Sequence, residues 1–291
     1  DNLSTGKIEN LNKGAKFYQA DIRSQEIRAI LERERPEVIN HHAAQISVPD
    51  SVKDPIHDAD VNIKGLLNLI ECSKGYLKKF IFISSGGAIY GDAEEYPTTE
   101  AYQPKPMSPY AITKLCSEYY LNYYKHQFGL NFTVLRYSNI YGPRQIPHGE
   151  AGVVAIFMEN ILQNRPSTIY HFPGEEDGMV RDYCFVKDVA KANLLALQRG
   201  DGEILNIGTG RGTRTRELYD MIIEAYESLT GRAALELKST FRGPAREGDI
   251  PKSCLVVRKA EEVLGWRPET QLLEGLKKTW GWRLGTESPQ K

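Results

Sequence analysis

The chain has 291 residues, of which 41% are hydrophobic and 26% charged, as is ordinary for a globular protein with one large or two smaller domains. Its 37 basic and 38 acidic residues leave a formal net charge of -1, which gives no reason to expect a nucleic acid or a membrane as a partner. Four scattered cysteines, no signal peptide and no apolar stretch near the ~20 residues of a membrane span predict a cytoplasmic protein without a metal site or disulfides.

Short apolar segments alternate with longer helical patterns in the first half of the chain. The apolar segments predict strands at residues 16–18, 38–39, 80–83 and 133–137, and the helical patterns cover residues 24–35, 56–75 and 109–128. Short strands separated by helices indicate a parallel sheet that is covered on both faces. Ligands of such sheets bind at the carboxyl ends of the strands, where residues 41–47, 84–91 and 139–145 fall.

The chain begins at a point that looks like the turn after a strand. A dinucleotide-binding fold opens with a strand, a Gly-rich phosphate turn and a helix, followed ~20 residues later by an acid for the adenosine ribose. Asp1 fits that acid, so we expect the first strand, the Gly-rich loop and the first helix to be missing. Two interpretations stay open: the chain lacks residues that its gene encodes, or it is a non-catalytic fragment without the pyrophosphate loop.

The most informative motif is the run from Ser108 to Lys114, at the start of the third helical pattern. Tyr110 and Lys114 are four residues apart and therefore share one face of a helix. A nearby cation favours the phenolate of a tyrosine, and such a pair can accept a proton from a substrate hydroxyl while a nicotinamide accepts the hydride. The spacing alone is weak, because similar pairs occur on the surface of many amphipathic helices.

From about Pro143 onwards, longer loops with glycine and proline join helical patterns at residues 153–163, 188–199, 215–229 and 272–283. We therefore expect a second, smaller and discontinuous domain. The predicted boundaries place residues 1–143 and about 182–200 in the first domain, and residues 144–181 and about 201–291 in the second. The acidic segment 169–178 is predicted to be a solvated loop.

Many motifs, in the same order along nearly the whole chain, resemble those of the extended short-chain dehydrogenase/reductases. Within these, the chain is most similar to the UDP-galactose (UDP-glucose) 4-epimerases of the NAD-dependent epimerase/dehydratase type. The motifs include Ala20-Asp21-Ile22, residues 41–45 and 60–62, Ser84-Ser85, Tyr110 with Lys114, residues 135–137 and 139–145, Arg181-Asp182-Tyr183, residues 206–210, and Arg246-Glu247-Gly248-Asp249. The resemblance implies an α/β fold: a Rossmann-type doubly wound parallel sheet that binds NAD, and a smaller α/β domain that binds the nucleotide sugar. It also implies a homodimer formed through helices near residues 56–75 and 109–128.

The activity that the resemblance implies is NAD-dependent 4-epimerisation of a UDP-hexose through a transient 4-keto sugar. Tyr110 would be the base for the sugar 4-hydroxyl, Lys114 would hold the nicotinamide ribose and lower the pKa of the tyrosine, and Ser85 would bind the same hydroxyl. Counted back from Tyr90, the family's hydroxyl position falls on Gly86; counted back from Tyr110, it falls on Ser85. We prefer Ser85 because the hydroxyl must reach the substrate, although both serines could instead cap the strand end.

The remaining site residues also come from the resemblance. At the cofactor we expect Asp1, Asn2, Asp21, Ile22, Ala43, Ala44, Gln45, Asn62, Ser84 and Tyr137, besides Tyr110 and Lys114. At the UDP-sugar we expect Ser47, Asn139, Val153, Phe157, Arg181, Arg246, Asp249 and Ser253, besides Ser85. Two arginines suit a diphosphate, because a guanidinium presents a planar fork of donors. Other roles stay open: Asp21 could cap a helix, Asn62 could be a satisfied polar residue, Asp249 could only orient Arg246, and Val153 and Phe157 could form an apolar helix face.

Two positions bear on the substrate and the reaction. Ser253 occupies the place where bulky residues exclude 2-acetamido sugars, so we expect the acetamido sugars to be accepted besides UDP-glucose and UDP-galactose. Gly86 and Gly87 stand where the sugar-nucleotide 4,6-dehydratases carry an Asp-Glu pair, which disfavours dehydration. The alternative within the enzymes is another 4-keto reaction on a nucleotide sugar, of the dehydratase or decarboxylase type.

Overall fold

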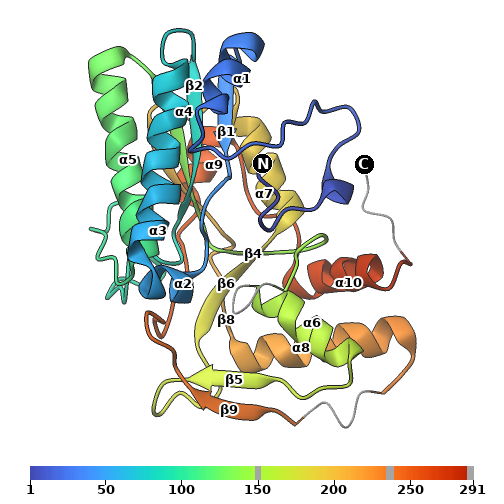
Figure 1. The fold of residues 1–291 in the computed structure, drawn as a ribbon. Coiled ribbons are helices and arrows are strands. Elements are labelled where there is room, and N and C mark those ends of the chain that lie inside the picture. The colour runs from blue at the N-terminus through green and yellow to red at the C-terminus, as the bar shows by residue number, and fades with distance from the viewer. Residues whose placement is uncertain (148–151, 234–238, 287–291) are drawn as a thin grey trace.

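The computed structural model describes residues 1–147, 152–233 and 239–286, which form two adjoining groups of elements (Figure 1). The first group is built on a parallel sheet with the strand order β1-β2-β3-β7. Its strands are β1 (Val38–His41), β2 (Lys79–Ser85), β3 (Asn131–Tyr137) and β7 (Glu203–Ile207). All three neighbouring pairs are parallel, with Ile81 opposite Thr133 and Leu135 opposite Leu205. The Rossmann-like parallel sheet predicted from the sequence is therefore confirmed.

Helices cover both faces of this sheet (Figure 1). On one face lie α1 (Glu26–Glu34), α4 (Gly65–Ser73) and α5 (Pro109–Phe128), with the short α2 (Val48–Lys53), α3 (Pro55–Ala59) and the π-helical η2 (Asp60–Lys64) before α4. On the other face lie α7 (Val186–Ala196) and α9 (Arg258–Leu264). Side chains alternate across a strand, so Phe80 and Phe82 pack with the first set, and Ile81 and Leu135 with the second.

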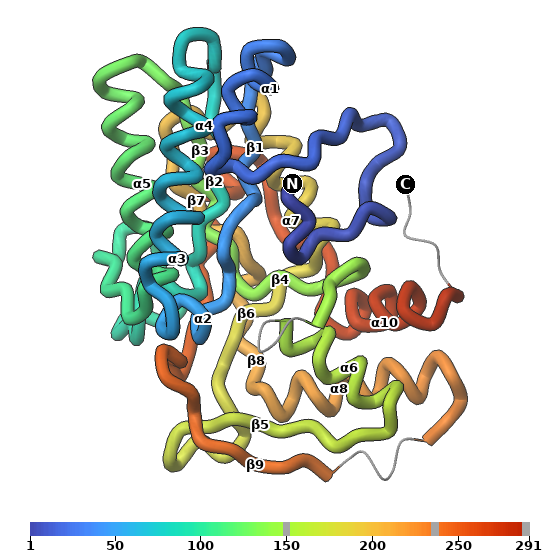
Figure 2. Tube along the Cα trace, viewed as in Figure 1, coloured from blue at the N-terminus to red at the C-terminus, as the bar shows by residue number. Residues whose placement is uncertain are grey.

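The second group contains two small sheets and three helices, with β5 and β9 at the bottom of the view in Figure 2. The sheets are β4 (Asn139–Tyr141), β6 (Val180–Phe185) and β8 (Gly212–Arg214), and β5 (Thr168–His171) with β9 (Phe241–Pro244); the helices are α6 (Val153–Leu162), α8 (Thr215–Thr230) and α10 (Leu272–Arg283). The core between the helices includes Phe157, Tyr219 and Trp280, each at most 3% exposed. A 3-10 turn, η1 (Ile8–Asn10), precedes all of these.

Several elements differ from the sequence-based expectations. Residues 16–18 form no strand. Their segment bonds with Asp1, whose amine donates to the Tyr18 carbonyl at 3.3 Å and whose carbonyl accepts from the Ala20 N–H at 3.2 Å, and the side chains of Lys16 and Tyr18 bond Glu34 of α1. The helix expected over 56–75 is divided into α3, η2 and α4. The start of the segment predicted as a solvated loop, at residues 169–171, belongs to β5 and pairs with β9.

Strand β7 bears on the expected domain boundaries. It pairs with β3 in the parallel sheet, although residues from about 201 were expected in the second domain. The division into two domains stays a proposal, and the pairing moves residues 203–207 into the first of them. Within the described ranges, no helix combines the length and the apolar character needed to cross a membrane.

Candidate active site

A cavity of ≈ 450 Å³ lies between the two groups of elements. One wall comes from the loop after β1, the end of β2 and the start of α5; the other comes from α6, β5, β6 and the segment after β9. Of the residues predicted at the UDP-sugar, all but Ser253 line the cavity: Ser47, Ser85, Asn139, Val153, Phe157, Arg181, Arg246 and Asp249. Residues that are far apart in the sequence thus meet around one space.

The start of α5 places the tyrosine and lysine of the most informative motif. Ser108 is the N-cap, since its Oγ accepts a hydrogen bond from the Ala111 N–H at 3.2 Å, and Pro109 fits the first helical position. Tyr110 therefore lies in the first turn, where it lines the cavity and hydrogen-bonds the Ser85 side chain. One turn later, Lys114 is buried; its Nζ lies 5.8 Å from the centre of the Tyr110 ring.

The choice between Ser85 and Gly86 for the hydroxyl position has a clear geometric answer. A Cβ on Gly86 would lie only 2.6 Å from a methyl carbon of Leu255, and Gly86 does not line the cavity. Gly87 lies on the cavity wall, 3.4 Å from the Asn139 side chain measured from where its Cβ would stand. Of the two positions, Ser85 is the one that lines the cavity and whose side chain acts on Tyr110, which supports the choice of Ser85.

Burial dominates the electrostatics of the pair. It raises the pKa of Tyr110 to about 12; the Ser85 hydrogen bond opposes this rise, and the negative charge of Asp58 adds to it. Burial also lowers the pKa of Lys114 to about 8, while Asp58 and Glu118 favour its cation. Lys114 was expected to lower the pKa of Tyr110, but the net change in this structure is upward, because burial disfavours the phenolate and Asp58 adds to that effect. Near neutral pH the pair is thus a neutral phenol beside a mostly charged amine.

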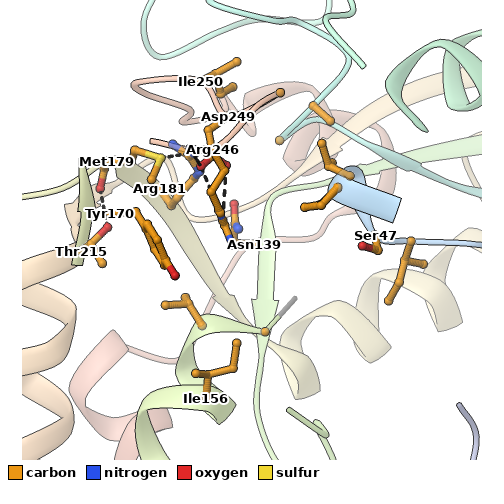
Figure 3. Close-up of a pocket in the computed structure, with 18 of the residues that line it drawn as sticks. Ser47, Asn139, Ile156, Tyr170, Met179, Arg181, Thr215, Arg246, Asp249 and Ile250 are labelled. Carbon is orange, nitrogen blue, oxygen red and sulfur yellow. Dashed lines mark hydrogen bonds and ion pairs between the residues drawn. The ribbon is translucent and has the colours of Figure 1, made fainter. Parts of the chain in front are cut away.

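Two arginines and an aspartate lie together on one wall, across from Ser47 (Figure 3). Arg181 comes from β6, and its Nη1 donates to the Val180 carbonyl at 2.9 Å. Across the described ranges, no carboxylate lies within ion-pair distance of Arg181, whereas Arg246 Nε donates to Asp249 Oδ2 at 3.1 Å. Burial lowers the pKa of Arg181, and the positive charge of Arg246 contributes. A cation with no carboxylate beside it at a cavity wall suits an anionic ligand such as a diphosphate.

The residues predicted around the adenosine, Asp1, Asn2 and Asp21, lie close together. Asn2 Nδ2 donates to Asp21 Oδ2 at 3.0 Å, and Asp1 contacts the same segment through its carbonyl and Ala20. Asp21 does not cap α1, whose N-cap is Gln25; its carboxylate accepts from Arg23, and this pairing holds the pKa of Asp21 well below its usual range.

Ile22 was predicted to lie at the adenine of the cofactor. Its side chain packs into the core against the start of α4, where a Cβ on Gly65 would lie 2.4 Å from Ile22 Cδ1. Gly65 is required there because any side chain would overlap the isoleucine. The side chain of Ile22 is therefore partly buried by this packing, and its contact with an adenine stays a prediction.

The side chain of Asn62 holds the loop after β1 through hydrogen bonds to its backbone. Asn62 is 3% exposed; its Oδ1 accepts from the Gln45 N–H at 2.8 Å and its Nδ2 donates to the Gln45 carbonyl at 3.0 Å. Asn62 is thus a satisfied polar residue that shapes the loop, and its direct contact with a cofactor stays a prediction. Gln45 is bonded within the protein, while Ala43 is exposed and Ala44 half-buried at the carboxyl end of β1.

Three further predicted residues, Ser84, Tyr137 and Ser253, do not line the cavity. Ser84 points to the opposite side of β2 from Ser85, and its Oγ donates to Glu118 Oε1 at 2.6 Å. The Tyr137 hydroxyl accepts a hydrogen bond from Asn193 of α7. Ser253 is 8% exposed and does not line the cavity, because its segment is tied to β6: the Ser253 N–H donates to the Val180 carbonyl at 3.0 Å.

Other residues of the cavity were not predicted. Tyr170 and Thr168 of β5 line it, as do Thr215 and Ser138. The ring centre of Tyr170 lies 4.9 Å from the Arg246 guanidinium. The sequence signal for Tyr170 was the alternation in β5, where Ile169 is 1% exposed and its neighbours turn to the cavity. Ser138 carries a buried hydroxyl for which no partner is found in the described part of the chain.

The donor set beside the cavity fits a nicotinamide ribose. Lys114 Nζ has three N–H donors and makes one hydrogen bond among the described residues, to the Ile83 carbonyl at 2.8 Å.

Comparison with known proteins agrees with this geometry. Residues 1–208 match the model of the "NAD dependent epimerase/dehydratase family". A UDP-glucose 4-epimerase of Mycolicibacterium smegmatis is 42% identical over 287 residues, which cover 96% of this chain and 88% of that protein. The crystal structure of a UDP-glucose 4-epimerase of Thermotoga maritima with UDP-glucose has a TM-score of 0.90 and 48% identity, covering 98% of this chain and 90% of that one. The UDP-glucose 4-epimerase of Thermus thermophilus in complex with NAD has a TM-score of 0.89 and 43% identity, covering 99% of this chain and 90% of that one. On these grounds the chain belongs to the NAD dependent epimerase/dehydratase family.

Proposed function

We propose that this chain interconverts UDP-glucose and UDP-galactose by NAD-dependent 4-epimerisation, which makes it an isomerase. The observation that carries the proposal is the meeting of Tyr110, Ser85 and Lys114 with Arg181 and Arg246 around one cavity. Such a cavity can bind a diphosphate on one wall while a hydroxyl of the attached sugar meets a proton acceptor on the other.

The residues supply proton transfer and orientation. Tyr110 acts in its phenolate form: it accepts the proton of the sugar 4-hydroxyl as that carbon is oxidised to a ketone, and the resulting phenol returns the proton when the ketone is reduced on the opposite face. Ser85 hydrogen-bonds the same oxygen and fixes its distance from the phenol. NAD, when bound, supplies the hydride acceptor and then the hydride donor for the sugar carbon. The cation of Lys114 favours the phenolate that accepts this proton.

The residues that would hold NAD follow the carboxyl edge of the sheet. Lys114 would bind the nicotinamide ribose, Ala43 and Ala44 would lie along the middle of the cofactor, and Asp1, Asn2 and Asp21 would meet the adenosine. Asn62 and Gln45 would act indirectly, because their hydrogen bonds are spent on shaping the loop.

The UDP-sugar would lie across the cavity. Arg181, Arg246 and Asn139 are placed for the diphosphate, and Val153 with Phe157 would provide an apolar surface beside the uridine. Asp249 would orient Arg246 through their ion pair. A dehydratase or decarboxylase is disfavoured by Gly87, which lines the cavity without any group that could move a proton.

The test is direct. Purified protein supplied with NAD and UDP-glucose should form UDP-galactose, followed by NMR of the sugar anomeric protons, and should leave C5 unlabelled in deuterated solvent. Tyr110→Phe should reduce kcat by about 10²- to 10⁴-fold, the usual contribution of a general base. A wild-type protein loaded with NAD that forms no galactose epimer, or that labels C5, would contradict the proposal.

We further propose a homodimer through α3, α4 and α5, and a cytoplasmic location. These helices carry large exposed side chains, among them Ile56 at 81%, Tyr119 at 65% and Tyr123 at 51%. Burial of such a surface against a second copy would remove apolar area from water. The four cysteines are unpaired, which suits a reducing compartment.

A further inference from the structure

Asp58 is a buried carboxylate for which the proposed reaction has no use. It lies on α3 with no exposed surface, and both of its oxygens accept hydrogen bonds. Oδ1 accepts from Gln45 Nε2 at 2.7 Å and from Asn62 Nδ2 at 3.1 Å, and Oδ2 accepts from Thr113 Oγ1 at 2.7 Å. Three donors from three segments converge on one acid, which is the arrangement that stabilises a carboxylate out of water.

The donors connect Asp58 with both walls of the active site. Thr113 lies on α5 between Tyr110 and Lys114, and its hydroxyl is also 3.0 Å from the Tyr110 carbonyl. Gln45 donates to the Ser47 carbonyl at 2.9 Å, and Ser47 is the N-cap of α2 on the cavity wall. Asp58 therefore joins the first turn of α5 to the loop after β1.

Two acids influence Lys114, and of these Asp58 is the one without an ion-pair partner among the described residues. Glu118, one turn further along α5, is already paired with Arg136 of β3 at 2.6 Å. No lysine or arginine of the described ranges forms an ion pair with Asp58. His41, the last residue of β1, and His42, which follows it, both feel the charge of Lys114; burial lowers the pKa of His41 to about 3 and also lowers the pKa of His42. On the same helix face, Tyr110 is a neutral phenol.

We propose that Asp58 is a positioning residue, ionised in the folded enzyme, which fixes the first turn of α5 through Thr113 and maintains the positive charge of Lys114 beside Tyr110. This inference rests on the proposed function. The energetic signs agree with the geometry: burial lowers the pKa of Lys114 and Asp58 opposes that change. Burial raises the pKa of Asp58 itself, and Thr113, Gln45, Lys114 and Asn62 all favour its ionised form.

The isosteric variant Asp58→Asn separates charge from shape. The amide oxygen keeps the bonds from Gln45 and Asn62, and the amide nitrogen donates to Thr113, whose hydroxyl turns to the Tyr110 carbonyl. Asp54→Asn is the matched control: it lies on the same turn of chain, is exposed, and caps α3 by accepting from the His57 N–H, a role that asparagine also fills. Thermal unfolding of both variants checks that the fold is kept.

The decisive readout is the titration of Lys114 by NMR of ¹³C-labelled lysine in the NAD-loaded protein, with the signal assigned by its loss in Lys114→Met. Asp58→Asn should lower the pKa of Lys114 by about one pH unit or more, as the loss of a neighbouring opposite charge does, and should move the alkaline limb of the kcat–pH profile to lower pH. Asp54→Asn should change neither. An unchanged Lys114 titration in folded Asp58→Asn would overturn the inference.

The role of Asp58 can be tested even if the wild type shows no epimerase activity or the variant does not fold. The titration needs no turnover, so it decides the role of Asp58 even where wild-type protein fails to epimerise UDP-glucose, an outcome that would count against the proposed function alone. Where Asp58→Asn does not fold, ¹³C-carboxyl titration of the wild type replaces it: Asp58 should be ionised at pH 7, and a protonated carboxyl there refutes the inference.

Discussion

Replacing Arg181 by methionine should weaken the binding of UDP without destabilising the protein. Methionine has a similar length and fills irregular buried space, so the change removes a charge and its donors while packing is largely kept. Arg181 donates to the Val180 carbonyl and contacts the Met179 sulfur, and it has no carboxylate at ion-pair distance in the described part of the chain. Its charge is therefore free to meet a diphosphate.

The expected effects of Arg181→Met on the affinity for UDP and on the free energy of unfolding differ. A hydrogen bond to a charged group contributes about 1.5–3 kcal/mol, which corresponds to a UDP dissociation constant roughly 10- to 150-fold higher in Arg181→Met. Removal of one member of a buried ion pair ordinarily costs about 3–5 kcal/mol of stability, because the partner charge is left unpaired. Arg181 leaves no carboxylate at ion-pair distance behind in the described part of the chain. Its removal loses attraction to Asp249 and relieves repulsion from Arg246, so the free energy of unfolding should change little.

Arg246→Met is the matched control. Its removal strands the Asp249 carboxylate on the cavity wall, where it would repel the diphosphate. We expect this variant to bind UDP more weakly than Arg181→Met does.

Calorimetric titration with UDP, which has the diphosphate but no sugar, measures the affinity of each variant, and thermal unfolding without ligand measures its stability. An Arg181→Met protein that binds UDP within about twofold of the wild type, or that loses as much stability as a broken buried ion pair, would refute the reasoning.

Three further outcomes are expected. Gly65→Ala should lower the free energy of unfolding in urea by about 1–3 kcal/mol, because its Cβ would stand 2.4 Å from Ile22 Cδ1, and Ile22→Val in the same chain should recover part of the loss. Tyr119→Glu with Tyr123→Glu should turn a dimer into a monomer in sedimentation velocity while the unfolding of the subunit is little changed; a dimer that persists would exclude this face. Ser253→Tyr should lower kcat/KM for UDP-N-acetylglucosamine about 10-fold or more relative to UDP-glucose. Equal turnover of the two sugars by that variant would show that Ser253, which lies behind the cavity wall, does not limit sugar size.

The sheet and the cavity could be predicted from the sequence where a residue's role depends on its place in an element. Tyr110 and Lys114 follow an N-cap and a proline, so both the start of the helix and the shared helix face could be predicted. Arg181 and Asn139 sit on strands whose ends meet at the cavity. The prediction of a strand at residues 16–18 was wrong, because strand formation depends on a neighbouring strand and not on apolar residues alone.

Roles that depend on a side chain's partner were harder to predict. Asn62 and Ser84 are the residue types that bind ligands, yet each spends its hydrogen bonds inside the protein, on Gln45 and on Glu118. No spacing rule separates such a residue from a ligand contact, because the partner comes from a distant segment. For Ser84 the period of the strand held a clue: Ser85 faces Tyr110, so its neighbour must face the other way.

The charge state of the tyrosine–lysine pair depends on burial, which the sequence does not show. The sequence places a cation four residues from a phenol, but it does not say how deeply either is buried. In the folded chain, burial raises the pKa of Tyr110 to about 12 and lowers that of Lys114 to about 8. A buried pair of this kind needs an acid nearby to keep the amine charged. Asp58 and Glu118 are the acids that favour the Lys114 cation, and because Arg136 already pairs with Glu118, that task falls mainly to Asp58.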